Sequence, residues 1–273
     1  MAADPPIITL TTDFGLRDEY VGVMKGVLAG RAPQARIIDL CHAIPPQDIR
    51  HAAYLLQASR RYFPPAALHV AVVDPGVGSA RQVVLLDTDH GRFLAPDNGV
   101  LTLLLAKPGC RAHAVTNQAL FLQPTSATFH GRDLFAPVAA ALANGADPAT
   151  LGPPIDPSAL IRLPLPQPRI DTASSTATGE VVAIDRFGNL ITNLQREQLA
   201  ALTDHLDQLT VHLDDRRIGI IHTTYADAAP DSALALIGSR DSLEIAVNQG
   251  NAARELHATI GSHIRLTLTC RGK

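Results

Sequence analysis

The first half of the chain alternates short apolar runs with longer segments of helical periodicity. Four apolar runs have the length of buried strands, at residues 8–13, 36–40, 68–74 and 82–88. Four longer segments have helical character, at residues 18–33, 46–64, 97–109 and 131–147. The first two of them carry apolar residues at i, i+3 and i+4. This alternation of strands and helices predicts a mostly parallel sheet with helices on its faces.

The pattern changes near residue 163. Residues 164–177 are rich in Pro, Ser and Thr and indicate a linker. Beyond them the apolar runs are short and joined by tight turns, which predicts hairpins within residues 180–194, 210–221 and 234–248. A last apolar run at residues 263–269 is suited to closing a small barrel.

These patterns divide the chain into two domains. Residues 1–163 are predicted to form an α/β N-terminal domain with a mostly parallel sheet, and residues 164–177 a linker. Residues 178–273 are predicted to form an antiparallel, β-barrel-like C-terminal domain.

Charge and composition narrow the range of partners. The net charge is −3, so the chain lacks the basic field that favours nucleic acid or a membrane surface, and we expect neither partner. No run approaches the roughly 20 apolar residues of a membrane span. The first ten residues lack a basic region and an apolar run of signal-peptide length, so we expect no signal peptide. The scattered Cys41, Cys110 and Cys270 form no disulfide or metal pattern, which fits the reducing cytoplasm.

Candidate chemistry lies at the ends of the predicted strands. Asp13, Asp74 and the pair Asp97–Asn98 each follow a strand, and His130 precedes a predicted helix. Each of these residues alone has a structural alternative as a turn or helix cap. Ligands of open α/β sheets bind at the carboxyl ends of the strands, however, and every candidate has a glycine nearby that allows close backbone approach. Together they indicate a site.

Several other kinds of site lack their signatures. The glycine-rich stretch 76–81 matches neither the P-loop nor the dinucleotide-binding pattern, and no G-x-S-x-G elbow is present. His42 and His130 are metal-ligand types, as are Asp13 and Asp74, but no H-x-H or H-x-x-x-H pair accompanies them. We therefore expect no metal and no cofactor.

A second set of polar residues lies in the turns of the predicted β domain, where each member alone is also ordinary hairpin chemistry. The set consists of Asp185, Asn189, Tyr225, Ser239, Arg240 and Glu244. An aromatic ring among amide and carboxylate groups suits a purine, since the ring can stack on the base and the polar groups can bind its edge.

Six motifs, in order along nearly the whole chain, resemble one family. They are TLTTDFG with DEYVGVMKG, VVDPGVGSAR, APDNGVLT, TFHGRDLFAPVAAALA, IDRFGNLITNL and GSRDSLEIAVNQGNA. Together they resemble the S-adenosyl-L-methionine hydroxide adenosyltransferases, the hydrolytic relatives of the fluorinases and chlorinases. The resemblance implies an α/β domain followed by a β-barrel-like domain, and homotrimers that bind S-adenosylmethionine (SAM) between neighbouring subunits.

The resemblance also implies a reaction, the hydrolysis of SAM to adenosine and methionine. The Asp–Arg–His signature of the hydrolytic branch falls on Asp74, Arg81 and His130. A neighbouring guanidinium favours the ionised form of a carboxylate, and a histidine is suited to general base work. Whether Asp74 or His130 takes the proton of the attacking water stays open at this point.

Further family contacts carry over to single positions. Asp13 matches a ribose-binding aspartate, Asp185 and Ser239 match methionine-binding groups, and Asn189 matches an adenine contact. Tyr225 falls where the family usually places a ring against adenine. The remaining substrate-binding candidates, which lie in matching motifs, are Asn98, Arg240 and Glu244.

Three rival functions share these residues. A halide-using relative would make a 5′-halo-5′-deoxyadenosine, but the Asp74, Arg81 and His130 set argues against it. A binding protein would hold adenosine or SAM without turnover. A metal-dependent hydrolase is the least supported of the three. Turnover rate, physiological role and preference among sulfonium nucleosides are not encoded in any motif.

Overall fold

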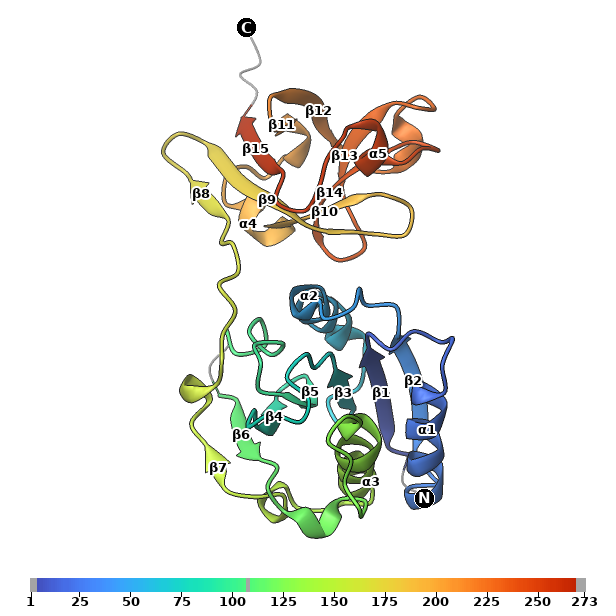
Figure 1. Cartoon of the computed structure of the whole chain (residues 1–273). Coiled ribbons are helices and arrows are strands. Elements are labelled where there is room, and N and C mark those ends of the chain that lie inside the picture. Colours follow the sequence, from blue (N-terminus) through green and yellow to red (C-terminus); the bar gives the residue numbers. More distant parts are fainter. Residues whose placement is uncertain (1–3, 107–108, 269–273) are drawn as a thin grey trace, which may run out of the picture. The chain divides into compact units, whose positions relative to one another are not determined.

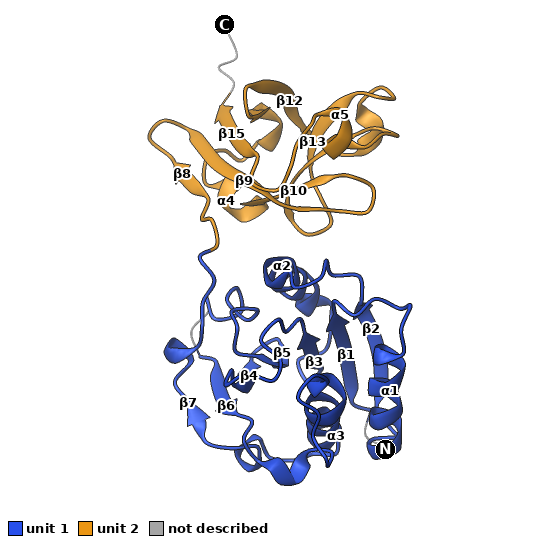
Figure 2. Ribbon diagram, viewed as in Figure 1, with its two compact units in different colours: residues 1–164 blue, residues 165–273 orange. Residues whose placement is uncertain are grey.

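The computed structural model describes residues 4–106 and 109–268. The chain forms two compact units, residues 1–164 and residues 165–273 (Figure 2). Each unit has its own sheet and its own hydrophobic core.

Unit 1 is built on a seven-stranded sheet with the order β2-β1-β3-β5-β4-β6-β7 (Figure 1). Its strands are β1 (Ile7–Thr12), β2 (Arg36–Cys41), β3 (Leu68–Val72), β4 (Val83–Thr88), β5 (Gly91–Pro96), β6 (Arg111–Ala114) and β7 (Pro154–Ile155). The β1–β2, β1–β3 and β3–β5 pairs are parallel, whereas β4 and β7 run antiparallel to their neighbours. The predicted mostly parallel sheet is confirmed.

Helices accompany this sheet at three of the four predicted segments. They are α1 (Tyr20–Arg31), α2 (Ile49–Ser59) and α3 (Ala136–Ala143), the last preceded by a π-helical turn (Gly131–Phe135). Short 3₁₀ turns complete the unit at Arg60–Tyr62, Gln118–Leu120, Pro148–Thr150 and Pro157–Ala159.

The two faces of the sheet carry different cores, because successive side chains of a strand point to opposite faces. Val70 and Val72 of β3 belong to the same buried cluster as Met24 of α1 and Val138 of α3. Ala71, between the two valines, belongs instead to the cluster that contains residues of α2. Helices α1 and α3 therefore pack on one face and α2 on the other, which leaves the strand ends free to carry polar groups.

The predicted helix over residues 97–109 is wrong for the part that the structure describes. Residues 100–106 form successive turns, and residues 107–108 lie outside the described residues. Gly99 has φ +97°, and the side chain of Thr102 donates to its carbonyl at 2.6 Å. The apolar residues of this segment have helical spacing but lie in turns, because the backbone at Gly99 leaves the helical region of φ.

Unit 2 is a closed barrel. Its strands are β8 (Arg169–Asp171), β9 (Thr176–Ile184), β10 (Leu190–Gln195), β11 (Leu209–Leu213), β12 (Arg216–His222), β13 (Ala233–Ile237), β14 (Ser242–Val247) and β15 (His263–Leu268). The order β10-β14-β13-β12-β11-β15-β9 closes through a β9–β10 pairing, and β8 adds to the outside of β9. The predicted barrel is confirmed, with one parallel pair, β12–β13.

The three predicted hairpins are β9–β10, β11–β12 and β13–β14. Two short helices and two 3₁₀ turns join the strands: α4 (Arg196–Ala200), α5 (Ala252–Glu255), Leu206–Gln208 and Tyr225–Asp227. The range 164–177, expected to be a linker, contains β8 and the first residues of β9. Its Ser- and Thr-rich part forms the turn of this strand pair, where Ser175 has φ +51°.

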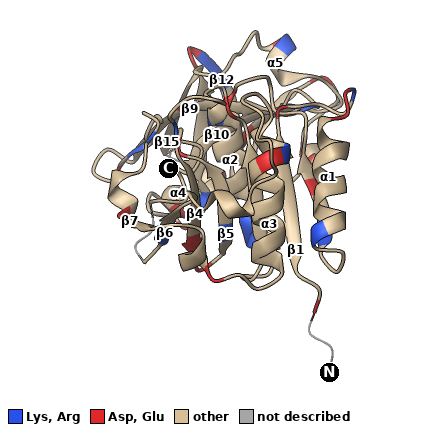
Figure 3. Ribbon diagram, turned by 60° about the horizontal axis from the view of Figure 1, so that its bottom comes forward, with Lys and Arg blue, Asp and Glu red and all other residues tan. Residues whose placement is uncertain are grey.

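Charged residues are interspersed along the ribbon (Figure 3). Among residues 4–106 and 109–268, no helix is long and apolar enough to span a membrane. Neither Cys41 nor Cys110 is part of a disulfide, and Cys270 lies outside the described residues.

A buried histidine joins the neighbouring strands β1 and β3 of unit 1. His69 of β3 is 1% exposed, and its Nδ1 lies 2.9 Å from the Oγ1 of Thr9 on β1. Its ring stacks on Phe93 with a centroid separation of 4.7 Å, and Phe63 packs edge-on against it. Burial lowers the pKa of His69 to about 4, because the imidazolium would lose its hydration.

His69 makes the stability of unit 1 depend on pH. Its pKa is lower in the folded chain than the ordinary 6.5, so its contribution is fully present above pH 6.5 and is lost as pH falls toward 4. Through this group alone, we expect the free energy of unfolding, measured in urea, to be about 2 kcal/mol lower at about pH 5 than at neutral pH. This difference defines the slope of unfolding free energy against pH. His69→Asn, which keeps a polar atom toward Thr9, should reduce that slope. An unchanged slope would contradict the assignment.

Candidate functional site

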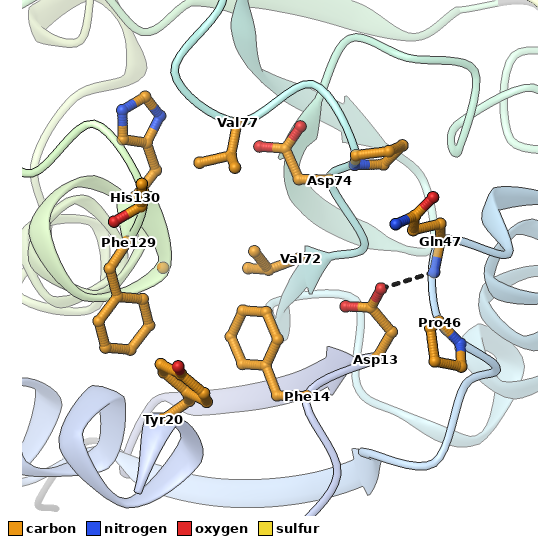
Figure 4. A pocket seen from close by; sticks show the side chains of 13 residues that line it. Asp13, Phe14, Tyr20, Pro46, Gln47, Val72, Asp74, Val77, Phe129 and His130 are labelled. Atoms are coloured by element: carbon orange, nitrogen blue, oxygen red, sulfur yellow. Dashed lines mark hydrogen bonds between the residues drawn. The ribbon is translucent and has the colours of Figure 1, made fainter. Parts of the chain in front are cut away.

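Two carboxylates meet at one edge of the unit 1 sheet. Asp13 follows β1 and Asp74 follows β3, and these strands are parallel neighbours with Thr12 in register with Val72. A pocket of about 430 Å³ opens there (Figure 4). Its lining consists of Asp13, Phe14, Tyr20, Pro46, Gln47, Val72, Asp74, Pro75, Val77, Thr128, Phe129, His130 and Gly131.

The glycine-rich turn after β3 brings an arginine back to Asp74. The backbone folds through Val77 N–H to Asp74 C=O (3.1 Å) and Ser79 N–H to Gly76 C=O (3.1 Å). Arg81 Nε then donates to both carboxylate oxygens of Asp74, at 3.1 and 2.9 Å, and its Nη2 also donates to Oδ2. The side chain of Asp74 is 4% exposed and that of Arg81 is 10% exposed, so the ion pair is shielded from water.

Arg81 has a second partner, His130. Its Nη2 lies 2.7 Å from the Nδ1 of His130, which comes from a segment 49 residues further along the chain. A guanidinium is a donor at every nitrogen, so the Nδ1 of His130 must be the acceptor. The neutral ring therefore carries its proton on Nε2.

The environment of His130 favours this neutral form. Burial lowers its pKa below the ordinary 6.5, and the positive charge of Arg81 lowers it further. The negative charges of Asp74 and Asp133 act in the opposite direction but do not reverse the shift.

Asp13 is held at the other side of the pocket. Its Oδ2 accepts a hydrogen bond from the backbone N–H of Gln47 at 2.8 Å. The loop that carries it is fixed by Phe14 N–H to Thr12 Oγ1 (3.2 Å) and by Gly15 N–H to His42 C=O (2.8 Å). His42 in turn is buried, with its Nδ1 2.9 Å from Thr12 Oγ1. Asp13 is thus presented on a rigid loop.

Three aromatic rings form one wall of the pocket, a feature that sequence reasoning missed. The centroids of Phe14, Tyr20 and Phe129 are 5.1 to 6.1 Å apart, and the rings pack at steep angles to one another. In Figure 4 these rings lie together, and Asp13 lies beyond Phe14 from the other two. The available signal was their place in the motifs, since Phe14 follows Asp13 and Phe129 precedes His130.

Asn98 is not among the residues that line this pocket. Its Nδ2 donates to the Val73 carbonyl at 2.9 Å, and its Oδ1 accepts from Val100 N–H at 3.2 Å. The neighbouring Asp97 accepts from Ile161 N–H at 2.9 Å. In unit 1 the side chains of this pair hold the end of β5 to adjoining backbone.

The second predicted set gathers in unit 2. In the β9–β10 hairpin, Asp185 Oδ1 accepts the backbone N–H groups of Phe187 and Asn189, both at 2.9 Å. Asn189 Nδ2 donates to the other oxygen at 3.1 Å. Both residues therefore shape the turn, and Phe187 at its tip is 73% exposed.

A buried carboxyl lies near this hairpin. Glu244 of β14 is 5% exposed, and Tyr225 donates its hydroxyl to it at 2.5 Å. Burial raises the pKa of Glu244; Asp185 adds to the shift, whereas Tyr225 and Arg240 oppose it. Burial followed by the hydrogen bond to Glu244 raises the pKa of Tyr225 as well. Ser239 lies with Arg240 in the β13–β14 turn.

Metal-ligand residues do not cluster in the described parts of the chain. Within residues 4–106 and 109–268, no three His, Cys, Asp or Glu side chains are grouped so as to hold a metal ion.

Comparison with family models covers both units. The model of the SAM hydroxide adenosyltransferase N-terminal domain matches residues 8–152, and that of the C-terminal domain matches residues 179–265.

Comparison with characterised proteins gives relatives over almost the full length. The (R)-S-adenosyl-L-methionine hydrolase of Salinispora tropica is 43% identical over 97% of this chain and 99% of the relative. The protein of the same name from Thermus thermophilus is 41% identical over 93% of this chain and 97% of its own. A fluorinase from Nocardia brasiliensis is more distant, at 26% identity over 96% of each chain.

Solved structures agree with this relationship. An uncharacterised conserved protein from Thermotoga maritima has a TM-score of 0.88 at 34% identity, over 95% of this chain and 99% of its own. A conserved hypothetical protein from Thermus thermophilus has a TM-score of 0.76 at 38% identity, over 96% and 99%. With both family models matched in order and hydrolase relatives above 40% identity, the chain belongs to the SAM hydroxide adenosyltransferase family.

Proposed function

We propose that this protein hydrolyses S-adenosylmethionine to adenosine and methionine by attack of water on the ribose C5′. The observation that carries the proposal is the buried Arg81 bound to both Asp74 and His130 at a pocket of suitable size. The hydrolase names of relatives at 41–44% identity support the choice of substrate.

The chemistry of the substrate fits a site made of carboxylates. SAM is a sulfonium cation, and its methionine arm leaves as a neutral thioether that needs no proton. In the reaction the water oxygen forms a bond to C5′, the C5′–S bond breaks with its electron pair on sulfur, and one water proton must be removed. The carboxylates of Asp13 and Asp74 favour a cation that is partly removed from water.

The donor and acceptor arrangement supports Asp74 as the proton acceptor. The Nδ1 of His130 is occupied by Arg81, and its Nε2 carries a hydrogen, so neither nitrogen is open to a proton from water. Asp74 is fixed by Arg81, yet a carboxylate has four lone-pair directions, more than Arg81 fills. His130 then orients the water oxygen by donating from Nε2. Placing the nucleophile in line can supply roughly 7–11 kcal/mol of catalysis.

Substrate positioning is shared among the remaining residues. Asp13 holds the ribose hydroxyls, and the aromatic wall of Phe14, Tyr20 and Phe129 packs against the apolar parts of the substrate. The unit 2 set binds the two ends of SAM, with Asn189 and Tyr225 at adenine and Asp185 and Ser239 at the amino acid. Arg240 and Glu244 support these contacts, and Asn98 acts indirectly through the end of β3.

The active assembly in this proposal is a homotrimer with sites formed between subunits. Exposed apolar side chains that line the unit 1 pocket support a covering partner, since Tyr20 is 42% and Val77 is 36% exposed. Leu16, four residues before Tyr20 in the chain, is 74% exposed. The protein works in the cytoplasm, where SAM is made and used, and needs no cofactor or metal because the sulfonium is already an activated leaving group.

The direct test is incubation of the pure protein with SAM in H₂¹⁸O. We expect adenosine carrying ¹⁸O at the 5′ position, and unchanged activity after EDTA treatment. Formation of a 5′-halo-5′-deoxyadenosine in the presence of chloride or fluoride would instead support the halogenase alternative. Binding of SAM without products above the background rate would support a binding protein, and loss of activity with EDTA a metal enzyme.

Replacement of the proposed base should separate chemistry from binding. Asp74→Asn keeps the shape of the side chain but removes the charge that accepts the proton, so we expect turnover to fall about 10²–10⁴-fold. The dissociation constant for SAM, measured by calorimetry, should rise by a much smaller factor than turnover falls, because Asp13 and the other contacts still hold the substrate. Asp97→Asn is the matched control, because Asp97 also follows a strand but does not line the pocket. Wild-type turnover by Asp74→Asn would refute the role.

The pH dependence of kcat/KM should report His130. The Arg81 contact requires a neutral ring, so activity is present above the pKa of His130 and is lost as pH falls through it. Because burial lowers that pKa, we expect the acid limb to lie below pH 6.5. A limb at or above pH 6.5 in the free enzyme would contradict the neutral-histidine arrangement.

A further inference from the structure

The motif that contains His130 also contains two charged residues, Arg132 and Asp133, that the proposed reaction does not use. Asp133 lies in the π-helical turn after His130 and is 1% exposed, whereas the Arg132 side chain is 37% exposed. A buried carboxylate carries a large desolvation cost unless its partners compensate for it. Asp133 is such a buried carboxylate, and it lies only three residues after His130 in the chain.

Asp133 accepts hydrogen bonds at both carboxylate oxygens and at its main-chain carbonyl. Arg132 donates to its carboxylate through Nε at 2.6 Å and Nη2 at 2.9 Å, and the backbone N–H of Ser126 donates to Oδ2 at 2.8 Å. Its main-chain carbonyl accepts from Leu122 N–H at 2.8 Å. The Arg132 hydrogen bond holds the pKa of Asp133 below its ordinary value against the effect of burial, so the group is ionised.

These bonds tie down the segment 122–129, which leads into His130. Thr128 and Phe129 of this segment line the pocket, and the guanidinium of Arg132 lies 5.2 Å from the centre of the Phe129 ring. π-Helical turns often occur at functional sites, and here the turn carries the Asp133 that is hydrogen-bonded to this segment.

The same segment packs on the turn that carries Arg81. A Cβ added to Gly78 would lie 2.4 Å from the carbonyl oxygen of Ala127, so the two backbones are in direct contact. Gly78 also has φ +78°, which favours glycine. Fixing the segment therefore fixes the turn against it, and with them the 2.7 Å contact between Arg81 and His130.

We propose that Asp133 is a positioning residue of the site, which through the segment 122–129 sets His130 against Arg81 and keeps a negative charge behind the imidazole. The proposal rests on the proposed hydrolysis only for its kinetic readout. The geometry and the charge also have a readout that needs no turnover, the titration of His130.

The charged groups that face His130 are Arg81 and Asp74 from the turn after β3 and Asp133 from its own element. Arg81 lowers the pKa of His130, and the two carboxylates raise it. Asp133→Asn retains an oxygen that can accept from Ser126 N–H. It removes the negative charge and the two-oxygen contact in which Arg132 donates to both Oδ1 and Oδ2. The pKa of His130 should consequently fall, and the acid limb of the pH–rate profile should move to lower pH.

The experiment compares wild type, Asp133→Asn and Arg132→Gln in the full-length protein. His130 is titrated by NMR of the imidazole nitrogens, and kcat is measured with SAM across pH. For Asp133→Asn we expect a lower pKa of His130 and a fall in kcat that approaches the about 100-fold cost of a 1 Å misplacement. Arg132→Gln keeps the Asp133 charge, so it should slow turnover without moving the titration to lower pH.

Asp147→Asn is the control, because Asp147 caps a 3₁₀ turn by accepting from Ala149 N–H and does not line this pocket. A His130 titration in Asp133→Asn that coincides with wild type or moves to higher pH overturns the proposal. If Asp133→Asn does not fold, wild-type turnover by Arg132→Gln overturns it. Absence of hydrolysis by the wild type would refute the proposed function and leave the titration to decide the role of Asp133.

Discussion

The site depends on one guanidinium that serves two partners. Arg81 holds the carboxylate of Asp74 with Nε and Nη2, and with the same Nη2 it reaches the Nδ1 of His130. Because an arginine only donates, this contact decides which nitrogen of the histidine carries the proton. It also explains why the chain returns an arginine seven residues after a strand-end aspartate: the glycine-rich turn between them places a fixed cation beside the carboxylate.

The fold of unit 1 makes that arrangement possible. Parallel neighbours β1 and β3 deliver Asp13 and Asp74 to the same edge of the sheet, while apolar residues of both strand faces pack on α1, α3 and α2. Buried bonds such as Thr9 to His69 hold these strands in register. The rigid sheet thus supports loops that are free to specialise, which is the usual division of roles in α/β proteins. In unit 2 the barrel presents its polar set in the same manner, from hairpin turns and from β14.

Much of this was predictable from the sequence, because strands, hairpins and strand-end polar residues follow local patterns. The strand ends at Asp13 and Asp74 and the hairpin at Asp185 are examples. The failure at residues 100–106 has a local cause, since Gly99 leaves the helical region where apolar spacing predicted a helix. The aromatic wall and the 49-residue separation of Arg81 from His130 depend on tertiary structure, so no periodicity could reveal them. The resemblance supplied the Asp–Arg–His set, but not which atoms meet.

The central claim is that His130 is neutral and accepts from Arg81 at Nδ1. It is tested most directly by the nitrogen chemical shifts of the His130 ring in the ¹⁵N-labelled protein at neutral pH, assigned by comparison with His130→Gln. The account predicts a protonated Nε2 and an unprotonated Nδ1. A proton on Nδ1, or an imidazolium with protons on both nitrogens, would contradict it.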